Sequence, residues 1–136
     1  ITEEMRGGLD LFAGGYATEE ETAGAIRRVY EKDSYVIDPH TAVAADVYDK
    51  YRAQTGDGTP AVIASTASPF KFENSVMQAL GEPSDLPDLE LADRLSEKAG
   101  VPVPEAVNVL RTAPVRHNIV CDRDKMKDEV RRFLGI

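Results

Sequence analysis

The chain has 136 residues, 42% of them hydrophobic and 29% charged, a composition typical of a folded globular protein and not of a disordered one. This length suffices for one ordinary domain covering residues 1–136 and is too short for two. A net charge of −8 repels phosphate backbones and argues against nucleic-acid binding, and no apolar run approaches the roughly 20 residues of a membrane helix.

The first strong helix signals stand near the N-terminal end of the chain. Thr18 and Glu21 have the spacing of a capping box, and apolar residues then recur at helical spacing, which predicts a helix over about 19–31. Asp38 followed by Pro39 predicts the start of another helix, because Asp is a good N-cap and Pro a good first helical residue. The apolar positions of this second helix are Val43, Val47, Tyr48 and Tyr51.

Two short apolar runs predict β-strands. They cover residues 35–37 and 61–64, and the second is wholly apolar, as is typical of a strand covered on both faces. A helix separates them, which predicts a βαβ unit with parallel strands and a right-handed crossover. The expected fold class is therefore α/β, helix-rich, with a small parallel sheet flanked by helices.

The rest of the chain continues the helical pattern. We expect a helix capped by Ser68 and ended by Gly81, a helix over about 91–100, and a short one near 107–110. Residues 115–120 are a candidate last strand. Asp122 is expected to cap a final amphipathic helix, whose apolar positions are Met126, Val130, Phe133 and Leu134.

Chemistry is expected where the strands of a parallel sheet end, because α/β folds bind ligands at that edge. The two strand-to-helix turns are residues 37–41 and 65–69, and the second is rich in small hydroxyl side chains. Hydroxyl groups suit a ring nitrogen, a phosphate or a carboxylate. Taken alone the signal is weak, since hydroxyl residues at a helix start most often act only as caps.

The remaining reactive side chains favour no active site. His40 in a first helical turn and His117 in a candidate strand are interpreted as structural, and with one cysteine they make no metal-binding spacing. No residue is therefore assigned to catalysis or to a metal. Cys121 is interpreted as a half-buried structural thiol, and a single cysteine without an internal disulfide favours a cytoplasmic location.

Residues 65–72 resemble a known motif. Their sequence, Ser-Thr-Ala-Ser-Pro-Phe-Lys-Phe, is similar to the Thr-Ala-His-Pro-Ala-Lys-Phe motif of bacterial and fungal threonine synthases, although Ser68 replaces its histidine and Phe70 a small residue. Any role of that histidine is therefore inapplicable here. The run 35–42 and Arg116-His117-Asn118 before the last helix also look like this family, so the resemblance is collinear from about Leu11 onward. The matching motif residues are Thr66, Ala67, Pro69, Lys71 and Phe72.

The resemblance implies a pyridoxal-phosphate enzyme of the tryptophan-synthase-β-like fold type (fold type II). This family converts O-phospho-L-homoserine and water to L-threonine and phosphate. Thr66 matches the position whose hydroxyl faces the pyridine nitrogen of the cofactor, which makes it the expected cofactor-binding residue. Lys71 lies inside the same motif and is expected either in a structural ion pair or facing the substrate.

The resemblance is to the C-terminal part of the proteins of this family. Their Schiff-base lysine lies in the part of the chain that precedes it. The fragment alone is therefore expected to be inactive. It is also expected to expose an apolar face where the parent enzyme would pack, with members Val62, Phe70, Phe72 and part of the Leu9–Phe12 segment, and to self-associate through that face. The alternative is a stand-alone acidic α/β module that binds a partner or small ligand without catalysis.

Overall fold

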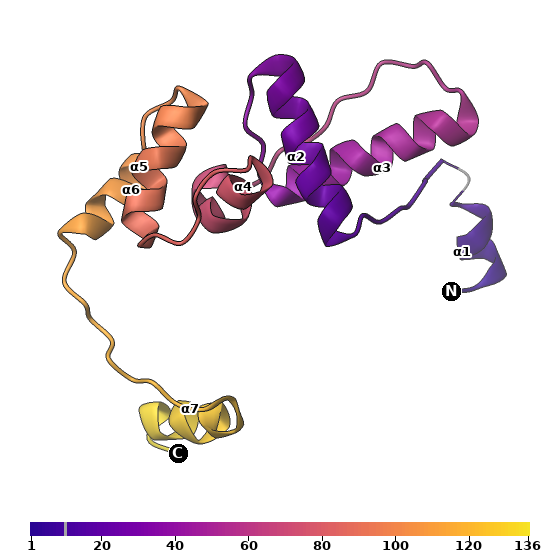
Figure 1. The fold of residues 1–136 in the computed structure, drawn as a ribbon. Helices are drawn as coiled ribbons and strands as arrows, with labels where there is room; N and C mark the ends of the chain where they lie inside the picture. Colours follow the sequence, from indigo (N-terminus) through magenta and orange to yellow (C-terminus); the bar gives the residue numbers. More distant parts are fainter. Residues whose placement is uncertain (10) are drawn as a thin grey trace.

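The computed structural model describes residues 1–9 and 11–136, and the regular structure in that part of the chain is entirely helical (Figure 1). The α-helices are α1 (Glu3–Gly7), α2 (Glu19–Asp33), α3 (Pro39–Thr55), α4 (Glu73–Ala79), α5 (Asp88–Ala99), α6 (Glu105–Asn108) and α7 (Met126–Leu134). Short 3-10 helices are η1 (Pro69–Lys71), η2 (Val109–Arg111) and η3 (Arg123–Lys125).

Three predicted helix ends are confirmed, whereas the predicted cap Asp122 forms no capping hydrogen bond and precedes only the short η3. At the start of α2 the Thr18 hydroxyl accepts from the Glu21 amide at 3.2 Å, and the Glu21 carboxylate accepts from the Thr18 amide at 2.7 Å, which completes the capping box. Helix α3 begins at Pro39 behind the cap Asp38. Helix α5 ends at Gly100, whose φ of +66° is the left-handed conformation that favours glycine.

Helices α2, α3, α4 and α5 surround the hydrophobic core. Helix α2 packs on α3 and α4, and α4 packs on α5, as the upper part of Figure 1 shows. Side-chain bonds link the same elements: Arg27 Nε donates to the Ala79 carbonyl at 3.0 Å, and the Tyr30 hydroxyl donates to the Lys98 carbonyl at 3.4 Å. The buried apolar residues are Ala25, Ile26, Val36, Ile37, Ala42, Phe70, Val76, Met77, Ala79, Leu91, Ala92 and Leu95.

The predicted α/β fold is wrong, because the described residues contain no strand and form a small all-helical domain. Residues 35–37 and 61–64 lack regular structure, and they form no backbone hydrogen bonds with each other. Val36 and Ile37 are buried against the helices instead, whereas Val62 is 98% exposed. A run of β-prone residues becomes a strand only when another strand pairs with its amides and carbonyls, and the described chain supplies none.

The predicted exposed face is partly confirmed. Val62 at 98% and Leu11 at 94% exposure are open to solvent, whereas Phe70 is only 5% exposed and belongs to the core. Phe72 is half-buried and packs against the same core. Phe70 is expected outside as part of the face that would pack on the parent enzyme, but in the structure it lies in η1 with its side chain in the core. Asp10, within the Leu9–Phe12 segment, lies outside the described residues.

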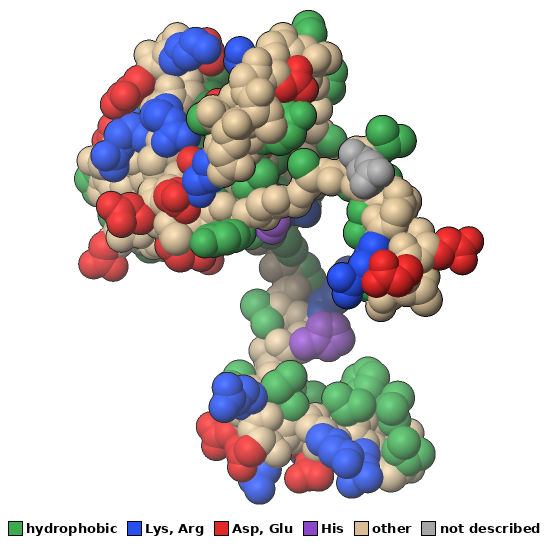
Figure 2. Space-filling model, turned by 90° about the vertical axis from the view of Figure 1, so that its right-hand side faces the viewer, with side chains coloured by type: hydrophobic (Ala, Val, Ile, Leu, Met, Phe, Trp, Pro, Cys, Tyr) green, Lys and Arg blue, Asp and Glu red, His purple; other side chains and the backbone are tan. Residues whose placement is uncertain are grey.

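The C-terminal tail stands apart from the core. Residues 112–122 run without regular structure and are exposed throughout, so the strand predicted at 115–120 is also wrong. Helix α7 lies at the end of this run, joined to the body by a narrow column of chain, with apolar side chains gathered along it (Figure 2). Its apolar residues are all exposed: Met126, Val130, Phe133 and Leu134. None of the helices in residues 1–9 and 11–136 has the length and hydropathy needed to cross a membrane.

Candidate functional site

The hydroxyl-rich turn at residues 65–69 lies beside the N-terminus of α3. On its C-terminal side, Ser68 Oγ accepts from the Phe70 amide at 3.3 Å, and the Phe70 ring is buried in the core. On its N-terminal side, Ser65 Oγ lies 2.8 Å from Thr41 Oγ1 in the first turn of α3. The turn is therefore attached to the body at both ends, with Thr66 between the two attachments.

The attachment at Ser65 leads to a buried carboxylate. Asp38, the N-cap of α3, is 1% exposed, and its Oδ1 accepts from the His40 amide at 2.9 Å and the Thr41 amide at 3.4 Å. The other oxygen, Oδ2, accepts from the Thr41 hydroxyl and lies 3.4 Å from Ser65 Oγ. The His40 ring is also close, with Nδ1 at 3.2 Å from Oδ1. One carboxylate thus caps the helix and holds the neighbouring turn.

Two opposed effects set the ionisation of Asp38. Burial raises the pKa of this carboxyl, but hydrogen bonds from the Thr41 hydroxyl and from the His40 and Thr41 amides outweigh burial, and the net pKa lies below its ordinary value of 3.8. Asp38 is therefore a carboxylate at neutral pH, and it acts as a hydrogen-bond acceptor, not as an acid.

Thr66 is exposed, and no other residue of the described chain forms a hydrogen bond with its hydroxyl. An exposed hydroxyl with an uncommitted proton can donate to a ligand atom such as a ring nitrogen without adding charge. Lys71, at the end of η1, is also exposed, and it forms no salt bridge within the described residues. Both predicted site residues are therefore exposed, Thr66 in the turn at 65–69 and Lys71 at the end of the η1 helix that follows it.

The other residues interpreted as structural lie at the surface, and His40 makes the local contact expected of it, with Asp38. His40 has a 65% exposed side chain, and its ring lies 5.0 Å from the Phe72 ring centroid in a tilted arrangement. His117 and Cys121 are exposed in the tail, so the expected half-buried thiol is wrong. The described part of the chain holds no group of three or more metal-ligating side chains that could bind an ion.

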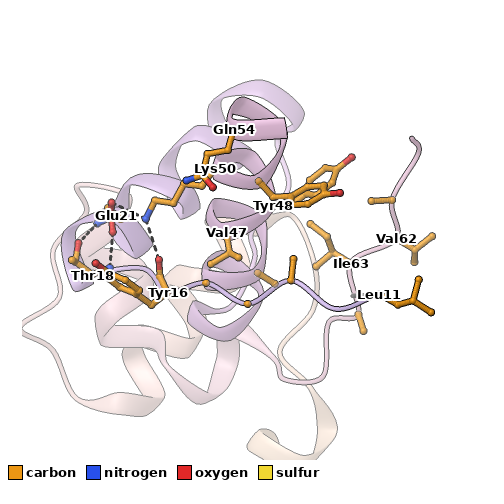
Figure 3. A pocket seen from close by; sticks show the side chains of 17 residues that line it. Leu11, Tyr16, Thr18, Glu21, Val47, Tyr48, Lys50, Gln54, Val62 and Ile63 are labelled. Atoms are coloured by element: carbon orange, nitrogen blue, oxygen red, sulfur yellow. Dashed lines mark hydrogen bonds and ion pairs between the residues drawn. The ribbon is translucent and has the colours of Figure 1, made fainter. Parts of the chain in front are cut away.

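A groove of about 1020 Å³ opens on the outer side of α3 (Figure 3). Its polar end is occupied by an ion pair, in which Lys50 Nζ lies 2.8 Å from Glu21 Oε1. Its other end is apolar and is lined by Leu11, Val62 and Ile63, from the two extended segments that flank the helix. Because its charged groups neutralise one another, we interpret the groove as a packing surface and not as a reaction site.

The sequence predicts the turns at 37–41 and 65–69 at one edge of a sheet, and the structure brings them together without a sheet, through a specific contact that was not predicted. Sequence reasoning identified Asp38 and Ser68 as caps and Thr66 as a donor, but it did not connect Ser65 with Thr41. The available signal was a threonine three residues after an aspartate N-cap, which puts its hydroxyl within reach of the carboxylate. Contact with Ser65, 24 positions away along the chain, has no local signature.

Comparisons with known proteins agree on one family. Residues 41–128 match the family model described as threonine synthase, C-terminal. Threonine synthase of Escherichia coli K12 is 41% identical over 81 residues, which are 59% of this chain and 18% of that enzyme. Threonine synthase of Schizosaccharomyces pombe is 40% identical over 75 residues, covering 54% of this chain and 15% of the enzyme.

A mammalian relative shows the same pattern. Threonine synthase-like 1 of mouse is 43% identical over 70 residues, which are 52% of this chain and 9% of that protein. In these comparisons the matched segment thus makes up less than a fifth of the relative's length.

Proposed function

Because the chain belongs to the threonine synthase C-terminal family, we propose that residues 1–136 act as one domain, the C-terminal part of a pyridoxal-phosphate-dependent threonine synthase. The proposed reaction converts O-phospho-L-homoserine and water to L-threonine and phosphate. A cytoplasmic location, favoured by the single cysteine, is part of the proposal.

The observation that carries the proposal is Thr66. Its hydroxyl is exposed in the motif-bearing turn and is uncommitted within the described chain, which suits the pyridine nitrogen of the cofactor. A hydroxyl donor leaves that nitrogen uncharged, unlike a carboxylate partner. Pyridoxal phosphate, when bound, supplies the electron-withdrawing ring, and Thr66 contributes the orientation of that ring.

Lys71 is the cation nearest to Thr66 along the chain. An exposed ammonium group five residues after the donor can attract the anionic groups of a phosphorylated amino-acid substrate. We propose a substrate-facing role for Lys71.

Two lysines of the helical body, Lys50 and Lys98, do not suit covalent attachment of the cofactor. Lys50 donates to Asp46 and Glu21, and Lys98 donates to Glu82, which raises the pKa of each ammonium group. A lysine held protonated is a poor nucleophile. Because the Schiff-base lysine of the family belongs to the part that precedes this region, the isolated chain is proposed to lack turnover and to need the remainder of a threonine synthase.

The test is a chimera in which this chain replaces the matching segment of the Escherichia coli enzyme. We expect the chimera to release phosphate from O-phosphohomoserine. Thr66→Val keeps the shape of the side chain and removes its donor, which costs about 1–3 kcal/mol in a closed site, so turnover should fall roughly ten- to a hundredfold. Phosphate release and the cofactor absorbance spectrum are measured on the same samples.

Thr112→Val is the matched control, because Thr112 is exposed in the tail and forms no side-chain hydrogen bond within the described residues. It should leave turnover unchanged. If Thr66→Val lowers only the melting temperature and keeps normal turnover per folded enzyme, the hydroxyl has only a structural role. A well-folded chimera without turnover would instead favour a binding module without catalysis.

A further inference from the structure

We propose that Asp38, Thr41 and Ser65 are positioning residues that orient the Thr66 hydroxyl, by committing the Ser65 proton to the body of the protein. The identity of the group that Thr66 contacts rests on the proposed function above. The positioning itself rests on geometry within this chain.

The direction of each hydrogen bond follows from the number of protons available. The Thr41 hydroxyl has one proton, and its short contact with Asp38 Oδ2 uses that proton, because a carboxylate only accepts. The 2.8 Å contact between Thr41 Oγ1 and Ser65 Oγ must then be donated by Ser65. The second neighbour of Ser65 Oγ, Asp38 Oδ2 at 3.4 Å, is also an acceptor.

Two adjacent hydroxyl groups therefore have different capacities. Ser65 has both nearby acceptors on the α3 side and no further proton to give outward. Thr66 keeps its proton, because its hydroxyl has no partner in the described chain. Of these two neighbouring hydroxyl groups, only that of Thr66 can donate to a ligand, because Thr41 and Asp38 accept the proton of Ser65.

The side-chain hydrogen bonds of Ser65 matter because, in the described chain, the backbone on either side of it forms no hydrogen bonds that would hold it in place. Among the described residues, 57–67 take part in no backbone–backbone hydrogen bond outside regular structure, and they contain no helix or strand. Ser65 is the last residue before Thr66, so its bonds to α3 restrain the backbone directly beside the donor. Removal of the Ser65 hydroxyl should release Thr66 on that side and leave the Ser68 cap intact.

The first experiment measures backbone ¹⁵N relaxation in the complete 136-residue chain. In the wild type, the Thr66 amide is expected to have an order parameter near that of rigid backbone, about 0.85, and in Ser65→Ala to fall below about 0.6. Ser65→Thr keeps the hydroxyl and should restore the wild-type value. Ser68→Ala is the control, because it removes a hydroxyl from the same turn without touching the network.

Variants of Thr41, the hydrogen-bond partner of Ser65, test the same inference independently. Thr41→Val removes the nearer acceptor of Ser65 and leaves only Asp38 Oδ2 at 3.4 Å, while Thr41→Ser retains it, so only the valine variant should lower the Thr66 order parameter. In the chimera with the Escherichia coli enzyme, Ser65→Ala should lower kcat about tenfold with KM within about twofold, since orientation is lost and substrate contacts are kept. Ser65→Thr should recover kcat.

The outcomes separate this inference from the proposed function. If Ser65→Ala frees Thr66 while Thr66→Val leaves turnover unchanged, the positioning network stands and the cofactor role of Thr66 fails. If Thr66→Val lowers turnover but Ser65→Ala changes neither the order parameter nor kcat, the network does not position Thr66 and the inference is overturned. Equal effects of Ser65→Ala and Ser68→Ala on the order parameter would overturn it as well.

Discussion

The Glu21 carboxylate takes part in two separate interactions, one within its own helix and one with α3. Its Oε2 accepts from the Thr18 amide at 2.7 Å within the capping box, and its Oε1 lies 2.8 Å from Lys50 Nζ on α3. The hydrogen bond from Lys50, followed by that from the Thr18 amide, lowers the pKa of Glu21 from 4.5 to about 2. A local cap thereby also becomes a contact between two helices.

Glu21→Gln should therefore flatten the dependence of stability on pH. Because the folded-state pKa of Glu21, about 2, lies below its ordinary value of 4.5, its contribution is fully present above pH 4.5 and is lost as the pH falls towards 2. Urea midpoints measured at several pH values should decline less steeply across this window in Glu21→Gln. Glu20→Gln is the control, being exposed in the same turn; if both variants behave alike, Glu21 makes no special contribution.

At the scale of elements, the segment before α2 packs closely on α3. A Cβ atom added at Gly15 would lie 2.6 Å from Val47 Cγ1, far inside van der Waals contact, whereas one added at Gly14 would meet nothing within 4 Å. Valine has few alternative rotamers in a helix, so it cannot easily move aside. The absence of a side chain at Gly15 is thus a condition of this contact.

Gly15→Ala should consequently destabilise the protein by about 1–3 kcal/mol, as overpacking usually does, and Gly14→Ala should change its unfolding free energy by less than about 0.5 kcal/mol. Chemical denaturation of the two variants measures the difference. Equal unfolding free energies of the two variants would mean that residues 11–16 can move away from α3 without loss of stability. The groove beside Val47 would then not be a stable part of the fold.

Helix boundaries were the part of these elements that could be predicted from the sequence, because their causes are local. Thr18, Asp38 and Gly100 each act through atoms within a few residues along the chain. The sheet could not be predicted correctly, because a strand at 61–64 depends on a partner segment that lies elsewhere. The link between Ser65 and α3 was missed for the same reason.

At the scale of the whole molecule, a helical body and an extended tail differ in what stabilises them. The body buries Leu91 and Leu95 almost completely, whereas every residue from 109 to 128 is exposed. Helix α7 has 9 residues, fewer than the roughly 12–15 that an isolated helix needs to be stable in water. Helix α7 is therefore too short to be stable without packing, and its apolar residues are exposed.

Deletion of residues 113–136 should leave the melting temperature of the body within about 2 °C of the complete chain, since the deleted part buries no core residue. Arg111 is retained, because its guanidinium donates to Asp93 at 2.7 Å. Leu95→Ala is the comparison and should cost about 2–5 kcal/mol. A large loss of thermal stability on deletion would show that the tail packs on the body in solution.

The extended run between α3 and η1 should make the chain susceptible to cleavage by proteases. Proteases cut exposed, extended backbone that can enter their clefts, and residues 58–66 are exposed and lie outside any helix. Ile26 precedes this run, and Leu91 and Leu95 follow it, but all three are buried in the same core. Cleavage within the run would therefore leave these core residues packed together. A nicked molecule would persist as two peptides held together by the packing of α2 against α4, with the Ser65 hydroxyl tethering the cut end to α3.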